Sequence, residues 1–258
     1  MNQISATSFG VVASDYSKSR AGFPSKLFDR LAHFGIGLPT QKILDIGTGT
    51  GTLARQFAAR GCQVVGLDAD ERMLEQAKIL AIQEGVDVEF IGSKAEDIPL
   101  SGGEFDVIAA GQCWHWFEHK AVLREVSRLL APDGKLVIAH FDWIPLKDNV
   151  VEATEKLIMA SNPAWHYEGG DGVHGHFLKD IVDAGFGDIE TFSFEHPVIY
   201  SHDDWCARIR ASAGISSLSE QGRAIFTDQL QAMLAEQYPT NPLRIHHRVF
   251  AIIAQKDS

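Results

Sequence analysis

Residues 44–54 form the sequence LDIGTGTGTLA, with glycines at positions 47, 49 and 51. The apolar residues before Gly47 predict a buried strand, and the residues after Gly51 predict a helix. Glycines between them permit unusual backbone angles and allow a ligand to touch the main chain. The stretch therefore predicts the strand–loop–helix turn of a nucleotide-binding α/β fold.

Acidic residues near this loop indicate the class of ligand more narrowly than the glycines do alone. Asp45 stands two residues before Gly47, where a carboxylate suits a positively charged amino group and would repel a pyrophosphate. Asp68 ends the second expected strand and can accept hydrogen bonds from two ribose hydroxyls. Glu96 and Asp97 follow the third expected strand, where an acid can bind the exocyclic amine of adenine.

From about residue 42, short β-rich runs alternate with amphipathic ones, which is typical of a parallel sheet covered by helices. Expected strands are 42–46, 63–67, 87–91, 105–110 and 135–140, and expected helices are 24–34, 51–60, 70–84 and 120–130, the last ended by Pro132-Asp133-Gly134. Further along, the pattern predicts an irregular to helical segment at 145–172, a helix at 175–184, a strand at 188–194, mostly helix at 203–237 and a final strand at 249–255.

Five segments, in this order and spacing, resemble the motifs of class I S-adenosylmethionine (SAM)-dependent methyltransferases of the type 11 group. They are LDIGTGTG at 44–51, VVGLDADERML at 64–74, GSKAEDIPL at 92–100, FDVIAAG at 105–111 and RLLAPDGKLVI at 128–138. The resemblance covers residues 40–141 closely. It implies SAM as cofactor and a Rossmann-like, doubly wound, seven-stranded α/β sheet whose last strand, 249–255, runs antiparallel.

The resemblance also implies a domain organisation. We expect a single methyltransferase domain over 1–258, with a helical lead-in at 1–40, a SAM-binding core at 41–141 and a final strand at 248–258. An acceptor-side half at 142–247 would carry a helical cap insertion at about 201–242.

The resemblance implies roles for residues in these motifs: the glycine loop lines the cofactor, Asp68 binds its ribose, Asp97 meets adenine and Met73 packs on the adenine face. The full set expected to bind the cofactor is Tyr16, Arg20, Asp45, Gly47, Thr48, Gly49, Gly51, Asp68, Ala69, Met73, Ala95, Glu96, Asp97, Gly111, Gln112 and Trp116.

Two further segments, 16–24 (YSKSRAGFP) and 111–117 (GQCWHWF), resemble the trans-aconitate methyltransferase-like branch. That branch acts on small molecules, some of them carboxylic acids, and the resemblance implies that Tyr16 and Arg20 close over the cofactor. Residues 111–117 differ from the Asn-Pro-Pro-Tyr type that marks nucleic-acid amine methylation.

The acceptor is expected beyond the carboxyl ends of the strands, beside the glycine loop. His115 is the candidate general base, because imidazole titrates near neutral pH; the alternative is that His115 only packs and hydrogen-bonds in the cofactor pocket. Residues expected to contact the acceptor are Trp114, His115, Asp142, Trp143, Trp165 and Arg210, with Trp205 and Arg208 as further candidates. An arginine would suit a carboxylate acceptor, whereas a solvated helix face is the alternative for either arginine.

Composition limits the partners. The 258 residues are 45% hydrophobic and carry a net charge of −11, which opposes binding to nucleic acid. The three cysteines are far apart and predict neither a disulfide nor a metal site, consistent with a cytoplasmic protein. No signal or membrane span is expected. Histidines 166, 174 and 176 lie in a glycine-rich segment and predict no metal site; a monomer or homodimer is expected.

Two other functions share part of this pattern. A SAM-binding sensor or partner protein would keep the cofactor pocket without methyl transfer. An NAD-dependent oxidoreductase would need the G-x-G-x-x-G spacing and a pyrophosphate at the helix N-terminus, close to the repelling Asp45. The sequence therefore favours a SAM-dependent methyltransferase acting on a small-molecule substrate, with carboxylates among the candidate acceptors.

Overall fold

The computed structural model describes residues 21–166 and 169–256, so Tyr16 and Arg20 lie outside the described residues. The chain divides into two compact units. We call residues 22–141, 174–194 and those from 249 onward the core unit, and residues 142–173 with 195–248 the second unit.

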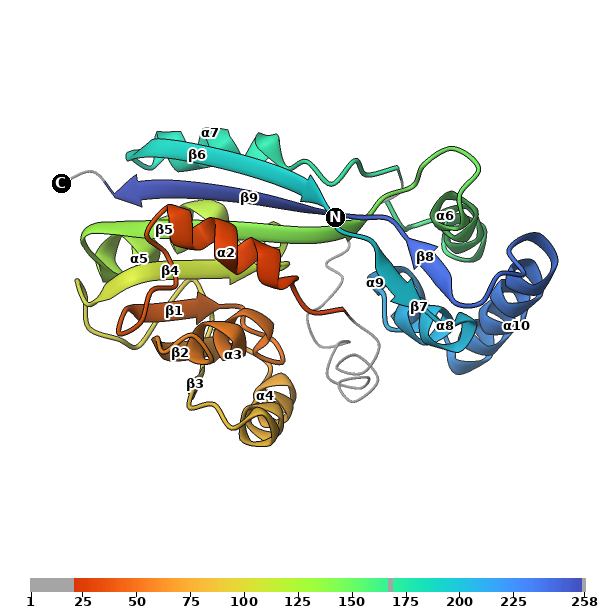
Figure 1. The fold of residues 1–258 in the computed structure, drawn as a ribbon, viewed down its shortest axis with the longest axis horizontal. Coiled ribbons are helices and arrows are strands. Elements are labelled where there is room, and N and C mark those ends of the chain that lie inside the picture. The colour runs from red at the N-terminus through yellow and green to blue at the C-terminus, as the bar shows by residue number, and fades with distance from the viewer. Residues whose placement is uncertain (1–20, 167–168, 257–258) are drawn as a thin grey trace. The chain divides into compact units, whose positions relative to one another are not determined.

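A seven-stranded sheet forms the core unit, in the order β3-β2-β1-β4-β5-β9-β6 (Figure 1). Its strands are β1 (Lys42–Ile46), β2 (Gln63–Asp68), β3 (Glu89–Gly92), β4 (Phe105–Gly111), β5 (Leu130–Trp143), β6 (Phe186–Glu195) and β9 (His247–Lys256). β1 pairs in parallel with β2 and β4, β2 with β3, and β4 with β5, whereas the last strand, β9, runs antiparallel. The predicted doubly wound sheet is confirmed.

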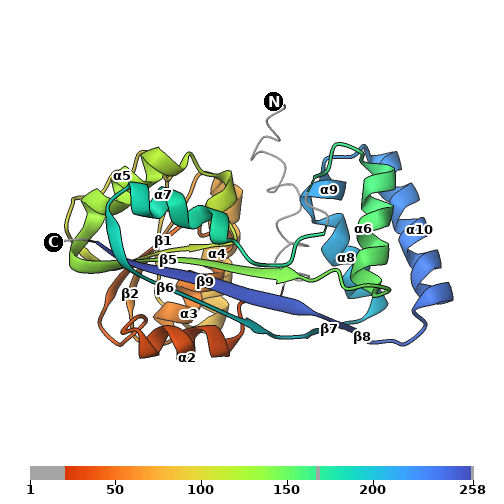
Figure 2. The same cartoon turned by 90° about the horizontal axis from the view of Figure 1, so that it is seen from above.

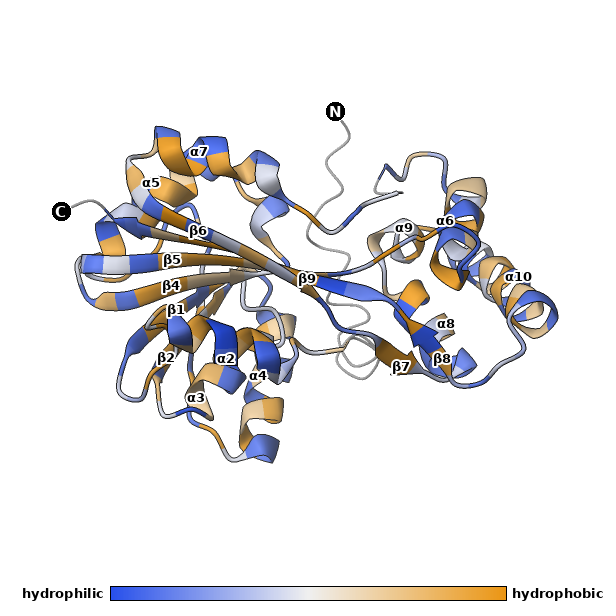
Figure 3. Cartoon of the chain, turned by 45° about the horizontal axis from the view of Figure 1, so that its top comes forward, coloured by the Kyte–Doolittle hydropathy of each residue, from blue (hydrophilic) through white to orange (hydrophobic). Residues whose placement is uncertain are grey.

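Helices cover both faces of this sheet. They are α2 (Ser25–His33), α3 (Thr52–Ala58), α4 (Glu71–Glu84), α5 (His119–Leu129) and α7 (Leu178–Asp183), with short 3-10 turns η2 (Trp114–Trp116) and η3 (Gly175–Phe177). Figure 2 shows α5 and α7 on one face and α2 and α3 on the other. α5 buries Val122, Val126 and Leu129 at helical spacing against the sheet. The central strands β4 and β5 are correspondingly hydrophobic (Figure 3).

The region after α5 differs from the expectation. The helix ends at Leu129 and β5 begins at Leu130, so Pro132-Asp133-Gly134 does not terminate the helix. Instead, the register with β4 shifts from Phe105↔Leu130 to Val107↔Lys135. Pro132 has no N–H to donate and Asp133 adopts φ +59°, so these residues form an irregularity within the strand.

The second unit is mainly helical and has its own apolar core. It contains α6 (Val150–Ser161), α8 (His202–Arg210), α9 (Ala213–Ser216), α10 (Glu220–Gln237) and an antiparallel pair of strands, β7 (Val198–Tyr200) and β8 (Leu243–Ile245). The expected cap at 201–242 is thus one part of this unit, which also includes α6. Within the described part of the chain, no helix has the length and apolarity needed to cross a membrane.

Candidate functional site

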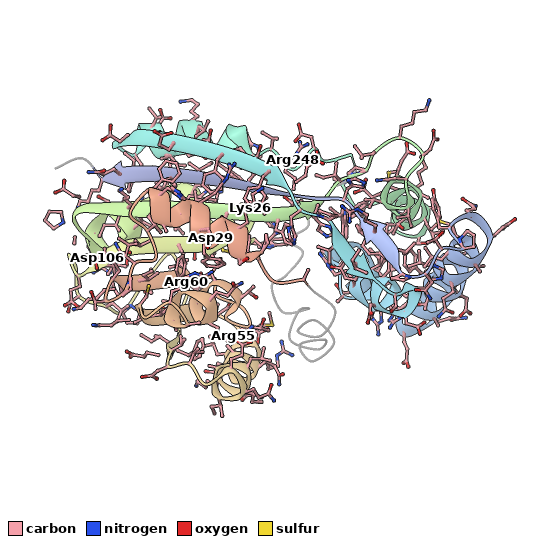
Figure 4. The ribbon with its side chains drawn as sticks, viewed as in Figure 1. Lys26, Asp29, Arg55, Arg60, Asp106 and Arg248 are labelled. Atoms are coloured by element: carbon pink, nitrogen blue, oxygen red, sulfur yellow. The ribbon has the colours of Figure 1, made fainter. Side chains whose placement is uncertain are left out.

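The glycine loop joins β1 to α3 at the carboxyl edge of the sheet. Gly47, Gly49 and Gly51 have φ values of +63°, +56° and +79°, in the left-handed region that side chains other than glycine rarely adopt. The turn is held by Thr48 N–H donating to the Leu67 carbonyl at 2.9 Å. Arg55 of α3, labelled in Figure 4, donates to the Thr50 carbonyl at 3.2 Å. The loop therefore has one defined shape.

Gly47 and Gly49 serve different purposes in this loop. A Cβ on Gly47 would lie 2.9 Å from atoms of Cys113 and Phe117, so packing against the protein itself requires glycine there. Among the residues that the structure describes, a Cβ on Gly49 would meet only the Cε of Met73, at 3.4 Å. The main chain at Gly49 is thus open on the side where a ligand could approach.

Asp45 lies beneath the loop with 1% of its surface exposed. Its Oδ2 accepts hydrogen bonds from Thr48 Oγ1 at 2.6 Å and from Ala54 N–H at 3.1 Å. Its Oδ1 is buried and has no hydrogen-bond partner among the described residues. Burial raises the pKa of Asp45 to about 7, the two hydrogen bonds lower it, and the charge of Asp68 raises it further. The ammonium group of a ligand could donate a hydrogen bond to Oδ1 and balance the charge of this carboxylate.

Asp68, at the end of β2, faces the same loop. Its Oδ2 accepts the Gly49 N–H at 2.8 Å and its Oδ1 accepts the Asp70 N–H at 2.9 Å. Burial raises its pKa, and these backbone hydrogen bonds lower it. Two carboxylate oxygens offer about four lone pairs, so Asp68 can accept a further hydrogen bond from a ligand hydroxyl.

The segment after β3 presents the expected adenine-binding acids. Ala95 is buried, Asp97 is exposed, and Glu96 Oε1 accepts the Glu118 N–H at 3.1 Å. Glu118 also caps α5 by accepting the Ala121 N–H at 2.7 Å. The start of α5 therefore fixes Glu96, a connection that the sequence did not indicate.

A clamp from the end of α5 holds the same segment. Arg128 donates to the carbonyls of Ile98 and Leu100 at 2.9 and 2.7 Å, and Glu125 accepts the Ile98 N–H at 3.0 Å. The hydrogen bond from Arg128 is the main reason that the pKa of Glu125 is lowered. The clamp fixes the backbone on the carboxyl-terminal side of Asp97.

β4 ends at Gly111, and the aromatic residues of the segment 113–117 follow it. Gln112 has φ +61°, and its side-chain amide donates to the Phe141 carbonyl. Trp114 is completely buried and stacks on His119 with ring centroids 5.4 Å apart, whereas His115 and Trp116 are exposed. The predicted contact of Trp114 with an acceptor stays a prediction, because its side chain has no exposed surface in the ligand-free chain.

Histidines gather at this edge of the core unit. His140 of β5 is 1% exposed and stacks on His174 with ring centroids 3.9 Å apart, and the His115 ring lies 5.7 Å from that of His140. Burial lowers the pKa of His176, and the charges of neighbouring His174 and His119 lower it further. Sequence reasoning missed His140, although its place near the carboxyl end of a central strand was a usable signal.

Four of the expected acceptor contacts belong to the second unit. Trp165 is buried there beside Gly214, and Trp143 donates from Nε1 to Glu155 Oε1 at 2.8 Å. Asp142 lies at the end of β5, and Arg210 is the last residue of α8. Hydrogen bonds thus join Asp45 to Thr48 and Asp68 to Gly49. The expected acceptor contacts divide between the two units.

Residues 44–138 match the family model described as a methyltransferase domain. The chain is 34% identical over 180 residues to a demethylmenaquinone methyltransferase of Renibacterium salmoninarum, which covers 64% of this chain and 74% of that protein. The chain belongs to the SAM-dependent methyltransferase family.

Other matches cover a smaller share of the matched protein. An uncharacterized methyltransferase of Mycobacterium tuberculosis is 33% identical over 129 residues, 50% of this chain and 50% of that protein, so the match spans about half the length of such relatives. The solved structure of Haemonchus contortus phosphoethanolamine N-methyltransferase 2, with phosphomonomethylethanolamine and S-adenosylhomocysteine (SAH), has a TM-score of 0.58 at 20% identity, covering 96% of this chain and 58% of that one. This likeness shows the shared fold.

Proposed function

We propose that the protein binds SAM at its glycine loop and transfers the methyl group to a small-molecule acceptor. The observation that carries this proposal is the second carboxylate oxygen of Asp45. It is buried without a partner among the described residues, next to a loop whose Gly49 main chain is open. Proteins rarely leave a buried carboxylate oxygen unsatisfied, so a positively charged ligand group accounts for it.

The described residues fit each part of this cofactor. Asp45 would receive the ammonium group, Asp68 the two ribose hydroxyls, and Asp97 the adenine amine, with Met73 against the adenine face. The Met73 side chain is only 6% exposed, and its Cε approaches Gly49. Ala69, Ala95, Gly111, Gln112 and Trp116 stay predicted contacts.

SAM supplies a methyl group on a sulfonium, already activated for in-line displacement. The protein's own task is to orient the acceptor and exclude water. In this proposal His115 takes a proton from an acceptor that carries one, and its exposed ring shortly after the end of β4 supports that role. For an ionised carboxylate no base is needed.

A small carboxylic acid is the acceptor class that we propose. The His115-Trp116 segment supports it through its resemblance to the trans-aconitate methyltransferase-like branch.

The test is a turnover assay with SAM and a panel of small carboxylic acids, amines and thiols, in which SAH is quantified. We expect acceptor-dependent SAH formation with at least one carboxylic acid. SAM binding without SAH formation across the panel would instead indicate a sensor. Tighter binding of NAD than of SAM would overturn the cofactor assignment.

A further inference from the structure

The short turn η2, which carries His115, is held against the glycine loop by the residues on either side of it. Cys113, just before the turn, donates from Sγ to the Ile46 carbonyl at 3.2 Å. Phe117, just after it, lies with Cys113 so close to Gly47 that a Cβ there would be 2.9 Å from atoms of both. The turn therefore lies directly beside the loop at which we propose that SAM binds.

His119, the first residue of α5, holds the middle of this turn. Its Nε2 lies 3.1 Å from the Trp114 carbonyl oxygen, and its ring stacks on the Trp114 ring with centroids 5.4 Å apart. The Trp114 carbonyl and the His115 N–H belong to one planar peptide group. A hydrogen bond to that carbonyl therefore fixes the plane of the peptide group that leads into His115.

Asp180 of α7 fixes the ring of His119 in turn. The Asp180 Oδ2 lies 2.7 Å from Nδ1 of His119, and Phe177 packs edge-on against the same ring with centroids 5.4 Å apart. A carbonyl and an ionised carboxylate only accept hydrogen bonds, so the two bonds together require a proton on each ring nitrogen. The ring then carries a positive charge, which the Asp180 carboxylate balances. His119 thus bridges α7 and the turn.

We propose that His119 is a positioning residue for methyl transfer: its bridge from Asp180 to the Trp114 carbonyl sets the orientation of His115 beside the glycine loop. The inference rests on the proposed function, in which His115 contacts the acceptor. The side chains of His119 and Asp180 are 23% and 39% exposed, so their ion pair contributes little to the stability of the fold. Its effect is expected on turnover, because a small displacement of a group beside the reacting atoms lowers the rate strongly.

The experiment compares His119→Phe and His119→Gln with the wild type, each as the full chain loaded with SAH. Phenylalanine keeps the stacking on Trp114 but removes both hydrogen bonds, whereas the glutamine amide can still donate to the Trp114 carbonyl. The turn itself should persist in both, because the Phe117 N–H also donates to that carbonyl at 3.1 Å. Amide NMR spectra follow the His115 N–H, which we expect to shift in His119→Phe and to return part of the way in His119→Gln.

Binding and turnover separate orientation from folding. SAH affinity, measured by calorimetry, should stay within about threefold of the wild type, because Asp45 and Asp68 are unchanged. The thermal midpoint should fall by less than about 3 °C. With an acceptor identified by the panel above, kcat/KM for that acceptor should fall roughly tenfold or more in His119→Phe, while KM for SAM changes by less than about threefold. His119→Gln should recover part of the loss.

Two aspartates of α7 give a matched pair. Asp180→Ala should shift the His115 amide signal in the same direction as His119→Phe. Asp183→Ala, about one turn later, removes a carboxylate that pairs with Lys179 and should leave the signal unchanged. An unshifted His115 signal in His119→Phe would overturn the inference, and so would parallel losses of SAH affinity, thermal midpoint and turnover, which indicate a purely structural role. If no acceptor of the panel is methylated, the proposed transfer fails instead, and the NMR comparison still decides whether His119 orients the turn.

Discussion

At the scale of single residues, Asp45 combines a structural role with a proposed binding role. One oxygen holds the glycine loop through Thr48 and Ala54, and the other is buried without a partner among the described residues. The raised pKa of about 7 means that ionising this carboxyl in the folded protein is unfavourable. Because a folded-state pKa above the unfolded value stabilises the protonated form, its contribution to stability is full below pH 3.8 and is lost as the pH rises to 7.

Asp45→Asn separates these two roles. The amide oxygen can still accept from Thr48 and Ala54, while the buried charge is removed. We expect the variant's stability relative to the wild type to rise by about 3 kcal/mol from pH 5 to pH 8. We also expect its SAM affinity to fall at least tenfold. Urea unfolding at both pH values and calorimetric titration with SAM measure the two effects. A variant that binds SAM as tightly as the wild type would refute the role of Asp45.

The two glycines offer a second comparison. Gly47→Ala should destabilise the fold by at least about 2 kcal/mol, because the added Cβ clashes with Cys113 and Phe117 and the residue has positive φ. Gly49→Ala should cost only about 1–2 kcal/mol, from φ alone, yet reduce SAM affinity at least tenfold because the methyl group occupies the open side of the loop. Thermal unfolding and SAM titration of both variants check this; equal stability losses would contradict it.

Sequence alone could indicate Asp45 and Asp68, because strand ends and glycine spacing fix where those side chains emerge. It could not indicate that Oδ1 of Asp45 lacks a partner, since that depends on which donors from Thr48 and α3 reach the carboxylate. The burial of Trp114 could not be predicted from the sequence either, because it results from packing against other segments of the folded chain.

At the scale of elements, α5 supports the cofactor site from outside it. Its first turn holds Glu96 through the Glu118 N–H, and its last turn holds the backbone after Asp97 through Arg128. α5 thus fixes the segment whose acids are proposed to meet adenine.

Arg128→Met tests this support. Removing the two hydrogen bonds to the Ile98 and Leu100 carbonyls should loosen the Asp97 segment and weaken SAM binding severalfold. Global stability should fall by less than about 1 kcal/mol, because this arginine is largely exposed. Arg124→Met, one turn earlier on the same exposed face, is the control and should leave affinity unchanged. Identical affinities for the two variants would contradict the clamp.

Some elements could be predicted from the sequence and others could not. Long periodic helices such as α4 were predicted within a residue, since Asp70 caps its start and Gly85 its end. The short strands β7 and β8 were missed, because three residues carry too little pattern and each is stabilised by the other.

At the scale of the whole molecule, a buried histidine makes stability depend on acid. His247 of the second unit is 3% exposed, and burial lowers its pKa to about 4. Because its folded-state pKa lies below the unfolded value of 6.5, the stability it contributes is present above pH 6.5 and is lost as the pH falls towards 4.

His247→Gln should remove this dependence. Between pH 7 and 5 the wild type should lose up to about 2 kcal/mol of unfolding free energy that the variant does not lose. Urea unfolding of both at the two pH values gives the difference, and His33→Gln, at an exposed histidine of the core unit, is the control. An unchanged pH dependence in His247→Gln would show that His247 is not the group responsible.

The most direct test of the whole account is calorimetric titration of SAH between pH 5.5 and 7, with adenosine as the matched ligand. SAH carries the ammonium group proposed to meet Asp45, and adenosine carries only the ribose and base. Because Asp45 must ionise to bind an ammonium, SAH affinity should rise roughly tenfold across this range with release of a proton, and adenosine affinity should change far less. An SAH affinity that does not vary with pH, or that varies only as adenosine does, would contradict the assignment of the glycine loop as the SAM site.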